Sequence, residues 1–381
     1  MDKSYFELLS DISQDEVYDK LLGFGLFSEK LPPIFQSVEF REYCKNIRKN
    51  GFSRVEHSHV DYLSNRNTNV PRNLAIPFPT AYEILCKEIS MNWESILTHF
   101  KDKTSNQEYK VSRIHFRKLS NRYGLFIMSY KNWMTDGDPI PELLLGKQYE
   151  VKCDISQCYP SIYTHSIPWA LVGKNYAKKN RDDKKWFNKI DKATRNMKNG
   201  ETHGILIGPH TSNLLSEVIL SSIDFELINN GWEYVRNIDD YTCYVETREK
   251  AEAFVVDINY QLREFGLNLN HKKTEILKLP FSNINRWTNI LKNSSVNFQK
   301  FKDYVDYNEI KSFMELCLSL MEENEENSAI LFYGIKILDG LNLTVNAEKY
   351  FIKTLVSLSL IYPYLVPLLH QYIFKKYDIE S

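Results

Sequence analysis

The sequence predicts an α+β fold, with a core of helices and short strands followed by an all-helical C-terminal region. Two strand-like runs, residues 232–236 and 241–245, enclose an adjacent pair of Asp residues, as expected of a β-hairpin. A third strand-like run, residues 149–153, leads directly into another Asp. From residue 284 to the end, the apolar residues follow helical spacing. The strands predict a sheet within the core, and the tail predicts helices alone.

Composition and charge set limits on the kind of protein. The chain has 381 residues, of which 43% are hydrophobic and 25% charged, so it can bury a core and form two or three sub-domains. Its formal net charge is −1. This near-neutral balance excludes a protein that binds nucleic acid by overall basicity, so any such binding must use local patches.

The cysteine pattern and the hydropathy predict a cytoplasmic protein without membrane contact. The six cysteines form no C-x-x-C pair, and the first residues lack a signal-like apolar core. The most apolar region, residues 351–374, is interrupted by Lys353, Pro363 and Pro367. These interruptions disfavour a membrane span and predict two packed helices.

The first part of the chain is predicted to be mostly helical up to about residue 70. Prolines then make residues 72–79 extended, after which Thr80 could cap a helix over residues 81–100. Residues 109–130 alternate apolar and polar side chains, which is typical of a hairpin. The basic side chains on this predicted hairpin include Arg113, Arg117 and Lys118.

The second part is predicted to run strand, helix, helix, strand, strand, helix over residues 148–278, with a final strand near residues 274–278. The remainder is helical, with a charged break at residues 322–326. Paired helices in this tail would suit a short α-solenoid.

Residues 174–198 form a basic run between the two carboxylate segments. Ten Lys or Arg residues against three Asp residues give this run a charge of +7 in a nearly neutral protein. Charge alone equally fits a solvated helix face. The position of the run favours a contact with nucleic acid or phosphate. The residues predicted to bind nucleic acid are Lys178, Lys179, Arg181, Lys184 and Lys185.

The carboxylates are the residues that carry chemistry. Asp239 and Asp240 would sit at the tip of a hairpin, and Asp154 would sit at a strand end five residues before Tyr159. An isolated Asp-Asp pair at a turn is usually ordinary turn chemistry. A third carboxylate on a rigid strand changes this interpretation, because hard divalent cations prefer fixed carboxylate oxygens. The pattern is what a nucleotidyl transferase with two Mg²⁺ ions needs.

A Gly-Pro-x-Thr-Ser turn lies between these carboxylate segments. Gly208 and Pro209 precede an apolar helix predicted over residues 214–223. Free N–H groups and a close backbone approach would let a nucleotide rest against such a turn. The alternative is a simple helix start that Thr211 or Ser212 caps.

Together these motifs resemble those of the reverse transcriptases. The matching segments are residues 154–159 (motif A), 208–212 (motif B), 237–240 (motif C) and 266–274 (motif D), in the order of that family. The resemblance implies a right-hand polymerase core. Its expected parts are an N-terminal helical segment (1–69), fingers (70–147), a palm (148–283) and a helical thumb or α-solenoid-like region (284–381).

The resemblance also implies roles for single residues. Asp154, Asp239 and Asp240 would be catalytic, and with Ile155 they would bind Mg²⁺ or Mn²⁺. Tyr159 would lie under the sugar of the incoming nucleotide and exclude a 2′-hydroxyl, whereas a merely buried tyrosine would not discriminate between sugars. The remaining residues expected to contact the nucleotide are Gly208, Pro209, Arg113, Arg117, Lys118 and Lys273. Basic residues on an exposed hairpin are, however, usually only solvated.

A closer likeness lies in residues 163–169, Tyr-Thr-His-Ser-Ile-Pro-Trp, followed by Gly-Lys at 173–174, and in residues 77–82. These strings resemble abortive-infection polymerases of the AbiK and AbiA type and related bacterial defence-associated reverse transcriptases. The likeness implies anti-phage defence, self-association, and untemplated DNA synthesis from dNTPs with the product attached to protein. Copying of a dedicated non-coding RNA template is the alternative enzyme, and a polymerase-like scaffold that binds phage protein or RNA is the non-enzymatic alternative.

Two positions depart from the usual family pattern. Ile207 stands where the family often has Gln before motif B, and Asn237 stands where motif C usually has Tyr. Both positions normally touch template, primer or a nearby base, which puts ordinary templated copying in doubt. A zinc site is a further alternative, but its ligands would be Cys153, Cys158, His165 and His203, whose spacing matches no structural zinc site.

Overall fold

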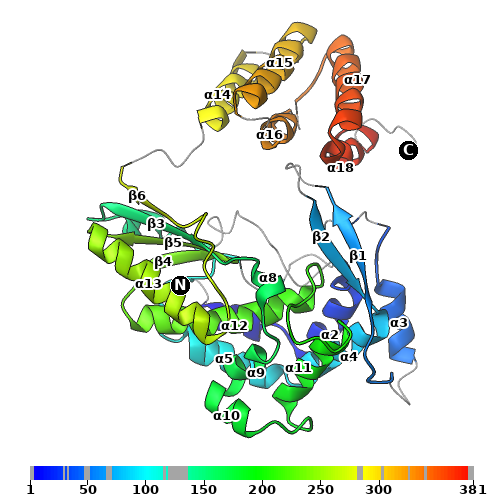
Figure 1. Ribbon diagram of the computed structural model, residues 1–381. Helices are drawn as coiled ribbons and strands as arrows, with labels where there is room; N and C mark the ends of the chain where they lie inside the picture. The colour runs from blue at the N-terminus through cyan, green and yellow to red at the C-terminus, as the bar shows by residue number, and fades with distance from the viewer. Residues whose placement is uncertain are drawn as a thin grey trace. The chain divides into compact units, whose positions relative to one another are not determined.

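The computed structural model describes residues 4–28, 31, 34–46, 52–65, 71–114, 117–118, 136–280, 286–301, 304–324, 327–338 and 341–375. The chain divides into two compact units (Figure 1). Unit 1 comprises residues 1–62 and 73–280, and unit 2 comprises residues 63–72 and 281–381. The predicted α+β class with a helical C-terminal region is confirmed. The finer division into fingers, palm and thumb stays a prediction.

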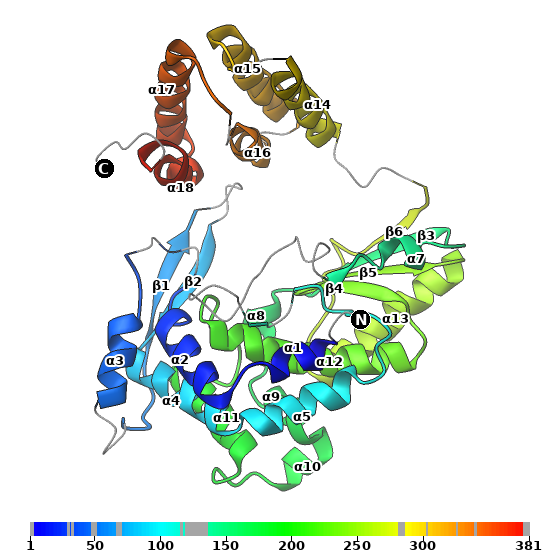
Figure 2. The same cartoon turned by 180° about the vertical axis from the view of Figure 1, so that it is seen from behind.

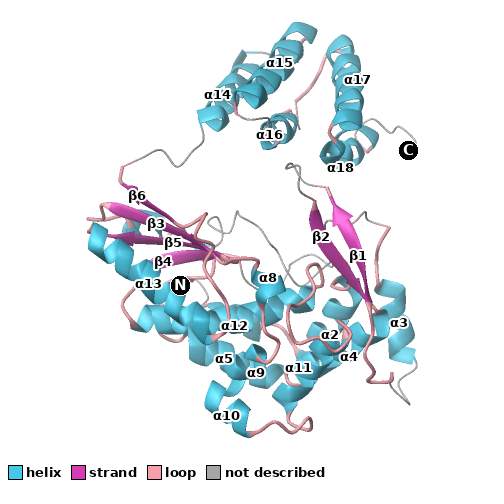
Figure 3. Cartoon of the chain, viewed as in Figure 1, coloured by secondary structure: helices cyan, strands magenta, loops and turns pink. Residues whose placement is uncertain are grey.

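A four-stranded antiparallel sheet forms the centre of unit 1, in the order β4-β5-β3-β6 (Figure 3). Its strands are β3 (Tyr149–Asp154), β4 (Tyr234–Asn237), β5 (Asp240–Val245) and β6 (Glu275–Lys278). All four predicted strands are therefore present, with ends shifted by a few residues. In the register of β3 and β5, Tyr149 lies opposite Val245 and Asp154 lies opposite Asp240. This register brings carboxylates from separate segments to one end of the sheet.

Two long helices pack beside this sheet, α12 (His210–Asn229) and α13 (Arg248–Glu264) (Figures 1 and 2). Helix α12 is apolar around most of its circumference, and it is accordingly buried along most of its length. Helix α12 also packs against α5 (Trp93–Thr104) and α9 (Ser166–Val172). The shared hydrophobic core includes Val151 and Cys243 of the sheet.

The N-terminal part of unit 1 contains α1 (Tyr5–Ser10), α2 (Gln14–Phe24) and α3 (Val38–Asn46). Ser4 and Ser13 form capping boxes that fix the starts of the first two helices. The prediction of mostly helix up to residue 70 is wrong in one place. Strand β1 (His59–Ser64) pairs with β2 (Arg72–Pro77), because the extended chain before the prolines finds a partner strand.

The single helix predicted over residues 81–100 is two helices. Helix α4 (Pro79–Met91) begins at a proline, and Phe78 occupies the N-cap position without a side-chain cap, so Thr80 is not the cap. Asn92 ends α4 by donating from its side-chain amide to the Glu88 carbonyl at 2.7 Å. Most of the hairpin predicted over residues 109–130 lies outside the described residues. Its described start runs beside β4 through a bridge between Ser112 and Arg236.

Between β3 and β4 the structure has more helices than the two predicted. Before α12 come α8 (Cys158–Ser161), α9 (Ser166–Val172), α10 (Lys174–Lys179) and α11 (Trp186–Asn196). A further short helix, α7 (Ile140–Leu143), precedes β3. The loop at residues 180–185 divides the basic run between α10 and α11.

Unit 2 is all-helical where it is described beyond residue 286. Its helices are α14 (Arg286–Phe301), α15 (Tyr307–Glu323), α16 (Ala329–Ile337), α17 (Val345–Ile361) and α18 (Val366–Leu369), with a 3₁₀ turn at Pro363–Leu365 and a π turn at His370–Phe374. They enclose a separate core that includes Phe313, Leu331 and Leu355. Pro363 ends the long apolar helix, as the sequence predicts. Among the described residues, no helix combines the length and the apolarity needed to cross a bilayer.

Candidate active site

The structure brings the three predicted carboxylates to the same end of the central sheet. Asp154 is the last residue of β3 and lies opposite Asp240, the first residue of β5. The backbone N–H of Ile155 donates to the Asp239 carbonyl at 3.2 Å, which ties the end of β3 to the hairpin turn. A tight turn of Ile238 and Asp239 joins β4 to β5. Ile238 adopts a φ of 60°, a strained conformation for a β-branched residue.

A buried ion network supports this strained turn from below. Arg236 is completely buried, and its guanidinium contacts Asp224 at 2.6 Å and Glu217 at 3.0 Å. The same guanidinium donates to the Ile238 carbonyl at 2.9 Å. Burial alone would lower the pKa of Arg236, but attraction to the two carboxylates raises it above its usual value. The charged network therefore fixes the hairpin that presents Asp239 and Asp240.

The carboxylates repel one another in this arrangement. The pKa of Asp240 is raised to about 6, first by burial and then by the negative charges of Asp239 and Asp154. Asp154 is compensated by a positive neighbour, because the Lys273 ammonium lies 2.8 Å from its Oδ2. The side-chain amide of Asn270 donates to Asp154 Oδ1 at 2.9 Å. Lys273 thus holds a positive charge at the place where three negative groups meet.

The donor set fits divalent cations. Carboxylate oxygens on adjoining strand ends are the ligands that Mg²⁺ and Mn²⁺ prefer. The raised pKa of Asp240 and the ammonium beside Asp154 both indicate a place where positive charge is stabilised. Within the described ranges, no three His, Cys, Asp or Glu side chains already stand in a metal-holding geometry. Both oxygens of Asp154 are instead bonded to Lys273 and Asn270.

Tyr159 connects the first carboxylate segment to the turn before α12. Its hydroxyl donates to Asn213 Oδ1 at 2.8 Å, and Asn213 lies in the first turn of α12. Burial raises the pKa of the Tyr159 hydroxyl above its usual range, so the group stays protonated. The predicted sugar-contacting residue is therefore held in a fixed position beside the predicted nucleotide-binding turn.

The turn itself requires glycine. Gly208 has a φ of 129°, and a Cβ at this position would lie 3.2 Å from the Ala75 carbonyl. Pro209 is the N-cap residue, and α12 begins at His210. The alternative, a helix start capped by Thr211 or Ser212, does not hold, because both residues are buried inside the first turn of the helix. The rigid Pro209 backbone sets the helix start in place of a side-chain cap.

The three basic residues expected to grip a triphosphate have protein partners. Arg117 makes a bidentate pair with Asp136, at 3.1 Å and 2.5 Å. Lys118 contacts Glu16 at 2.6 Å and lowers the pKa of that carboxyl to about 2. Arg113 donates to the Gly137 carbonyl at 2.5 Å. Their predicted contacts with a nucleotide stay predictions, and the pairs in the structure show that each also stabilises local structure.

The residues considered for zinc do not assemble. Cys153 and Cys158 are buried, and burial raises the pKa of the Cys153 thiol to about 12. The Nδ1 atom of His165 lies 2.6 Å from Asp191 Oδ2, which accepts from it, and His203 forms an isolated bridge with Tyr163. These side chains belong to the core and to a separate pocket, not to one metal site.

Sequence reasoning missed the residues that position Asp154 and Arg236 through hydrogen bonds. Asn270 bonds both the carbonyl and the carboxylate of Asp154. Glu217 and Asp224 bind the buried Arg236. A signal was available, since acidic residues spaced seven apart in an otherwise apolar helix share a face and need a buried cation.

The chain is similar to several solved telomerase structures. Apo telomerase from Candida tropicalis, truncated from its C-terminal domain, shares 12% identity over 68% of this chain and 59% of that chain, with a TM-score of 0.43. Telomerase from Candida albicans in complex with the TWJ fragment of telomeric RNA shares 13% identity over 90% of this chain and 66% of that chain, with a TM-score of 0.37. The chain thus spans 59% of the first of these telomerases. Among curated proteins, no significant match to the chain is found.

A family model described as reverse transcriptase (RNA-dependent DNA polymerase) matches residues 84–302. This match covers more than half of the chain and contains Asp154, Asp239, Asp240 and the turn at Gly208. The carboxylates meet at one end of the sheet in the order that the motifs require. The chain therefore belongs to the reverse transcriptase family of nucleotidyltransferases.

Proposed function

We propose that this protein builds DNA from deoxynucleoside triphosphates by transferring a nucleotide to a hydroxyl group with release of pyrophosphate. The observation that supports this activity best is the pairing of Asp154 with Asp240 across β3 and β5, with Asp239 in the adjoining turn. Carboxylates fixed on rigid strands provide electrostatic stabilisation that is organised before the reaction, which is usually the largest contribution to catalysis.

In this proposal each residue has a defined task. Asp154 and Asp239, with Ile155 and Asp240, would hold Mg²⁺ or Mn²⁺. When bound, such ions would neutralise charge on the phosphates and lower the pKa of the attacking hydroxyl. Tyr159 would pack under the deoxyribose. Lys273, now beside Asp154, would move its positive charge toward the leaving phosphate when the cations arrive.

The test is incorporation of labelled dNTPs by purified protein. We expect the wild-type protein to incorporate label with Mg²⁺ or Mn²⁺ and Asp239→Ala to lose activity by more than a thousandfold, because charge stabilisation in the transition state is lost. Asp102→Ala is the matched control, since Asp102 is an exposed carboxylate on α5. Equal activity of Asp239→Ala and the control would refute this catalytic site.

Synthesis without a template, primed by a protein hydroxyl, is the finer part of the proposal. Ile207 and Asn237 support it, because these side chains replace a Gln and a Tyr that usually touch template or primer. Ile207 uses its carbonyl to accept from the Ala75 N–H at 2.8 Å, and Asn237 pairs with Asp240 in the hairpin. Product that forms without RNA and stays attached to protein after denaturation is expected.

Copying of a bound RNA is the second candidate, and the family match to RNA-dependent DNA polymerases favours it. The same assay separates the two candidates. Incorporation that requires RNA, and that nuclease treatment of the purified protein abolishes, would support templated synthesis. Sequencing of nucleic acid that co-purifies with the protein then identifies the template.

A role in bacterial anti-phage defence completes the proposal. It rests on the likeness of residues 163–169 and 77–82 to abortive-infection polymerases. We expect cells that produce the wild-type protein in their cytoplasm to reduce phage plaque numbers, and cells with Asp239→Ala to be sensitive. Full protection by Asp239→Ala, with no incorporation in the assay, would instead support a scaffold that binds phage protein or RNA.

A further inference from the structure

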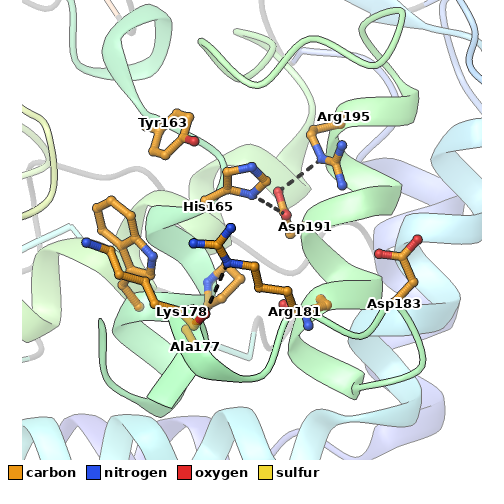
Figure 4. Close-up of a pocket in the computed structure, with 11 residues that line it drawn as sticks. Tyr163, His165, Ala177, Lys178, Arg181, Asp183, Asp191 and Arg195 are labelled. Carbon is orange, nitrogen blue, oxygen red and sulfur yellow. Dashed lines mark hydrogen bonds and ion pairs between the residues drawn. The ribbon is translucent and has the colours of Figure 1, made fainter. Parts of the chain in front are cut away.

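A pocket of about 280 Å³ lies among α9, α10 and α11, and none of its lining residues belongs to the carboxylate site (Figure 4). Its lining includes Tyr163, His165, Trp169, Lys178, Arg181 and Asp191. The volume is close to the lower end of pockets that bind small ligands, at roughly 300 Å³. It therefore suits a group of nucleotide size.

A histidine is fixed in one wall of this pocket. The Nδ1 atom of His165 lies 2.6 Å from Asp191 Oδ2, and the Asp191 side chain is 4% exposed. Arg195 approaches the other oxygen of Asp191 at 3.4 Å. A buried carboxylate that accepts from Nδ1–H orients the imidazole. Nε2 of His165 is then left without a partner among the described residues, and it remains available to a ligand.

Two cationic side chains from other segments also line this pocket. Lys178 of α10 holds its Nζ 5.5 Å from the centre of the Trp169 ring. Arg181, in the loop after α10, donates from Nε to the Lys178 carbonyl at 3.0 Å. Figure 4 shows the Arg181 guanidinium next to the His165 ring, with its Nε bonded to the Lys178 carbonyl. The terminal nitrogens of Arg181 have no partner in the part of the chain that the structure describes.

We propose that this pocket binds a nucleotide through its terminal phosphate. The His165 imidazole and the Arg181 guanidinium, with the Lys178 ammonium over Trp169 elsewhere in the lining, suit a phosphate monoester, which has three acceptor oxygens and a charge near −2. The centre of the Tyr163 ring lies 4.8 Å from the centre of the His165 ring and 5.7 Å from that of Trp169. This ring supplies an aromatic surface for the base or sugar. The nucleotide can come from the end of a DNA or RNA strand or from the free pool.

The composition of the pocket argues against catalysis by the histidine. A His–Asp pair that acts as a general base usually serves a Ser, Thr or Cys nucleophile. No Ser, Thr or Cys is among the described residues that line the pocket. Binding of an anion is the role that His165 and the basic side chains support, and Asp183, the second acid in the lining, is paired with Lys192 at 2.6 Å.

The pocket also divides the basic run into two kinds of residue. Lys178 and Arg181 line the pocket, whereas Lys179 is on the same helix but does not. A diffuse electrostatic patch would use all three cations about equally. A ligand bound in the pocket would contact Lys178 and Arg181 but not Lys179.

The experiment measures binding of fluorescently labelled pentanucleotides, with and without a 5′-phosphate, and of unlabelled dAMP as competitor. EDTA is present, so the proposed polymerase site contributes no cation-dependent binding. We expect the 5′-phosphorylated strand to bind at least tenfold more tightly than the strand with a 5′-hydroxyl, and dAMP to compete. Competition by dAMP identifies a free nucleotide as an accepted ligand, and its failure with tight strand binding restricts the ligand to strand ends.

Variants decide whether the pocket carries this preference. Lys178→Gln, Arg181→Gln and His165→Asn should each reduce the preference for the 5′-phosphate at least fivefold, and Lys179→Gln should retain it within twofold. Equal loss in Lys178→Gln and Lys179→Gln would overturn the proposal, as would equal binding of both strands to the wild-type protein. Because Asp239→Ala should keep the preference, failure of the proposed polymerase activity would not be mistaken for failure of this site.

Discussion

At the scale of single residues, Tyr159 is the side chain whose position gives the sharpest chemical expectation. Its hydroxyl is bound to Asn213, so its ring is fixed beside the turn that precedes α12. A fixed ring leaves less space for a 2′-hydroxyl than a mobile one, since its position is set before the nucleotide binds. Selection of deoxynucleotides would thus follow from packing alone.

Replacement of this ring should relax sugar selection. In Tyr159→Ala we expect the ratio of kcat/KM for a ribonucleotide over a deoxynucleotide to rise roughly tenfold or more. Tyr159→Phe is the matched control, because it keeps the ring and loses only the bond to Asn213. Single-nucleotide incorporation kinetics measure both ratios. An unchanged ratio in Tyr159→Ala would mean that the ring does not face the sugar.

Lys273 gives a second expectation at this scale. It competes with divalent cations for Asp154, because its ammonium is 2.8 Å from one carboxylate oxygen. In Lys273→Met, half-maximal activity should need several-fold less Mg²⁺, while kcat should fall because the leaving phosphate loses a positive neighbour. A titration of activity against Mg²⁺ measures both effects. Lys272→Met is the control, and an identical response from it would contradict this role.

At the scale of elements, the hairpin of β4 and β5 depends on charges buried beneath it. Arg236 contacts Glu217 and Asp224 of α12 and also the carbonyl of Ile238 in the turn. The bond to the turn helps to hold the strained conformation of Ile238. Helix α12 therefore does more than cover the sheet, since it carries the counter-charges that keep Arg236 in place.

Removal of one counter-charge of Arg236 should lower the free energy of unfolding. Glu217→Gln removes one charged partner of the buried Arg236 but leaves Asp224 in place, so the expected cost is about 1.5–3 kcal/mol, the range for hydrogen bonds to charged groups. Urea denaturation followed by circular dichroism gives the free energy of unfolding. Glu226→Gln, on the exposed face of the same helix, should change it by less than about 0.5 kcal/mol. Equal effects of the two variants would show that the network is not a stabilising element.

The sequence predicted the strands of the sheet and the three carboxylates, because strand periodicity and turn chemistry are local signals. It did not predict the division of residues 81–100 into two helices, since the cap at Asn92 depends on a side-chain bond to a carbonyl. It also did not predict β1, because the sequence of this strand shows no clear strand pattern without knowledge of its pairing with β2. The support from Asn270 required tertiary pairing, which no short motif encodes, whereas the seven-residue spacing of Glu217 and Asp224 in an apolar helix was a usable signal.

At the scale of the whole molecule, buried histidines link stability to pH. Burial lowers the pKa of His99 and of His210 from 6.5 to about 4, and both residues lie in unit 1. Between pH 6.5 and 4 the unfolded chain binds protons at these positions and the folded chain does not. The stability that these two neutral histidines contribute is therefore fully present above pH 6.5 and is lost as the pH falls toward 4.

The size of this loss can be measured. Each histidine should contribute up to about 3 kcal/mol, since one pKa unit corresponds to about 1.4 kcal/mol. Asp240 acts with the opposite sign, because its raised pKa favours the folded state at low pH. Denaturation at pH 7 and pH 4.5 should show a net decrease in the free energy of unfolding, and His99→Gln should make that decrease smaller. A decrease of the same size in His99→Gln would contradict this origin.

The most direct test of the central claim is a crystal structure with Mn²⁺ and a non-hydrolysable deoxynucleoside triphosphate, in which anomalous scattering locates the metal. The claim is that Asp154 and the Asp239–Asp240 pair hold divalent cations at one end of the sheet. It predicts anomalous peaks within about 2.0–2.3 Å of oxygens from Asp154 and Asp239, with Lys273 displaced from Asp154. Mn²⁺ bound elsewhere, with the ion pair of Lys273 and Asp154 intact in the presence of nucleotide, would contradict it.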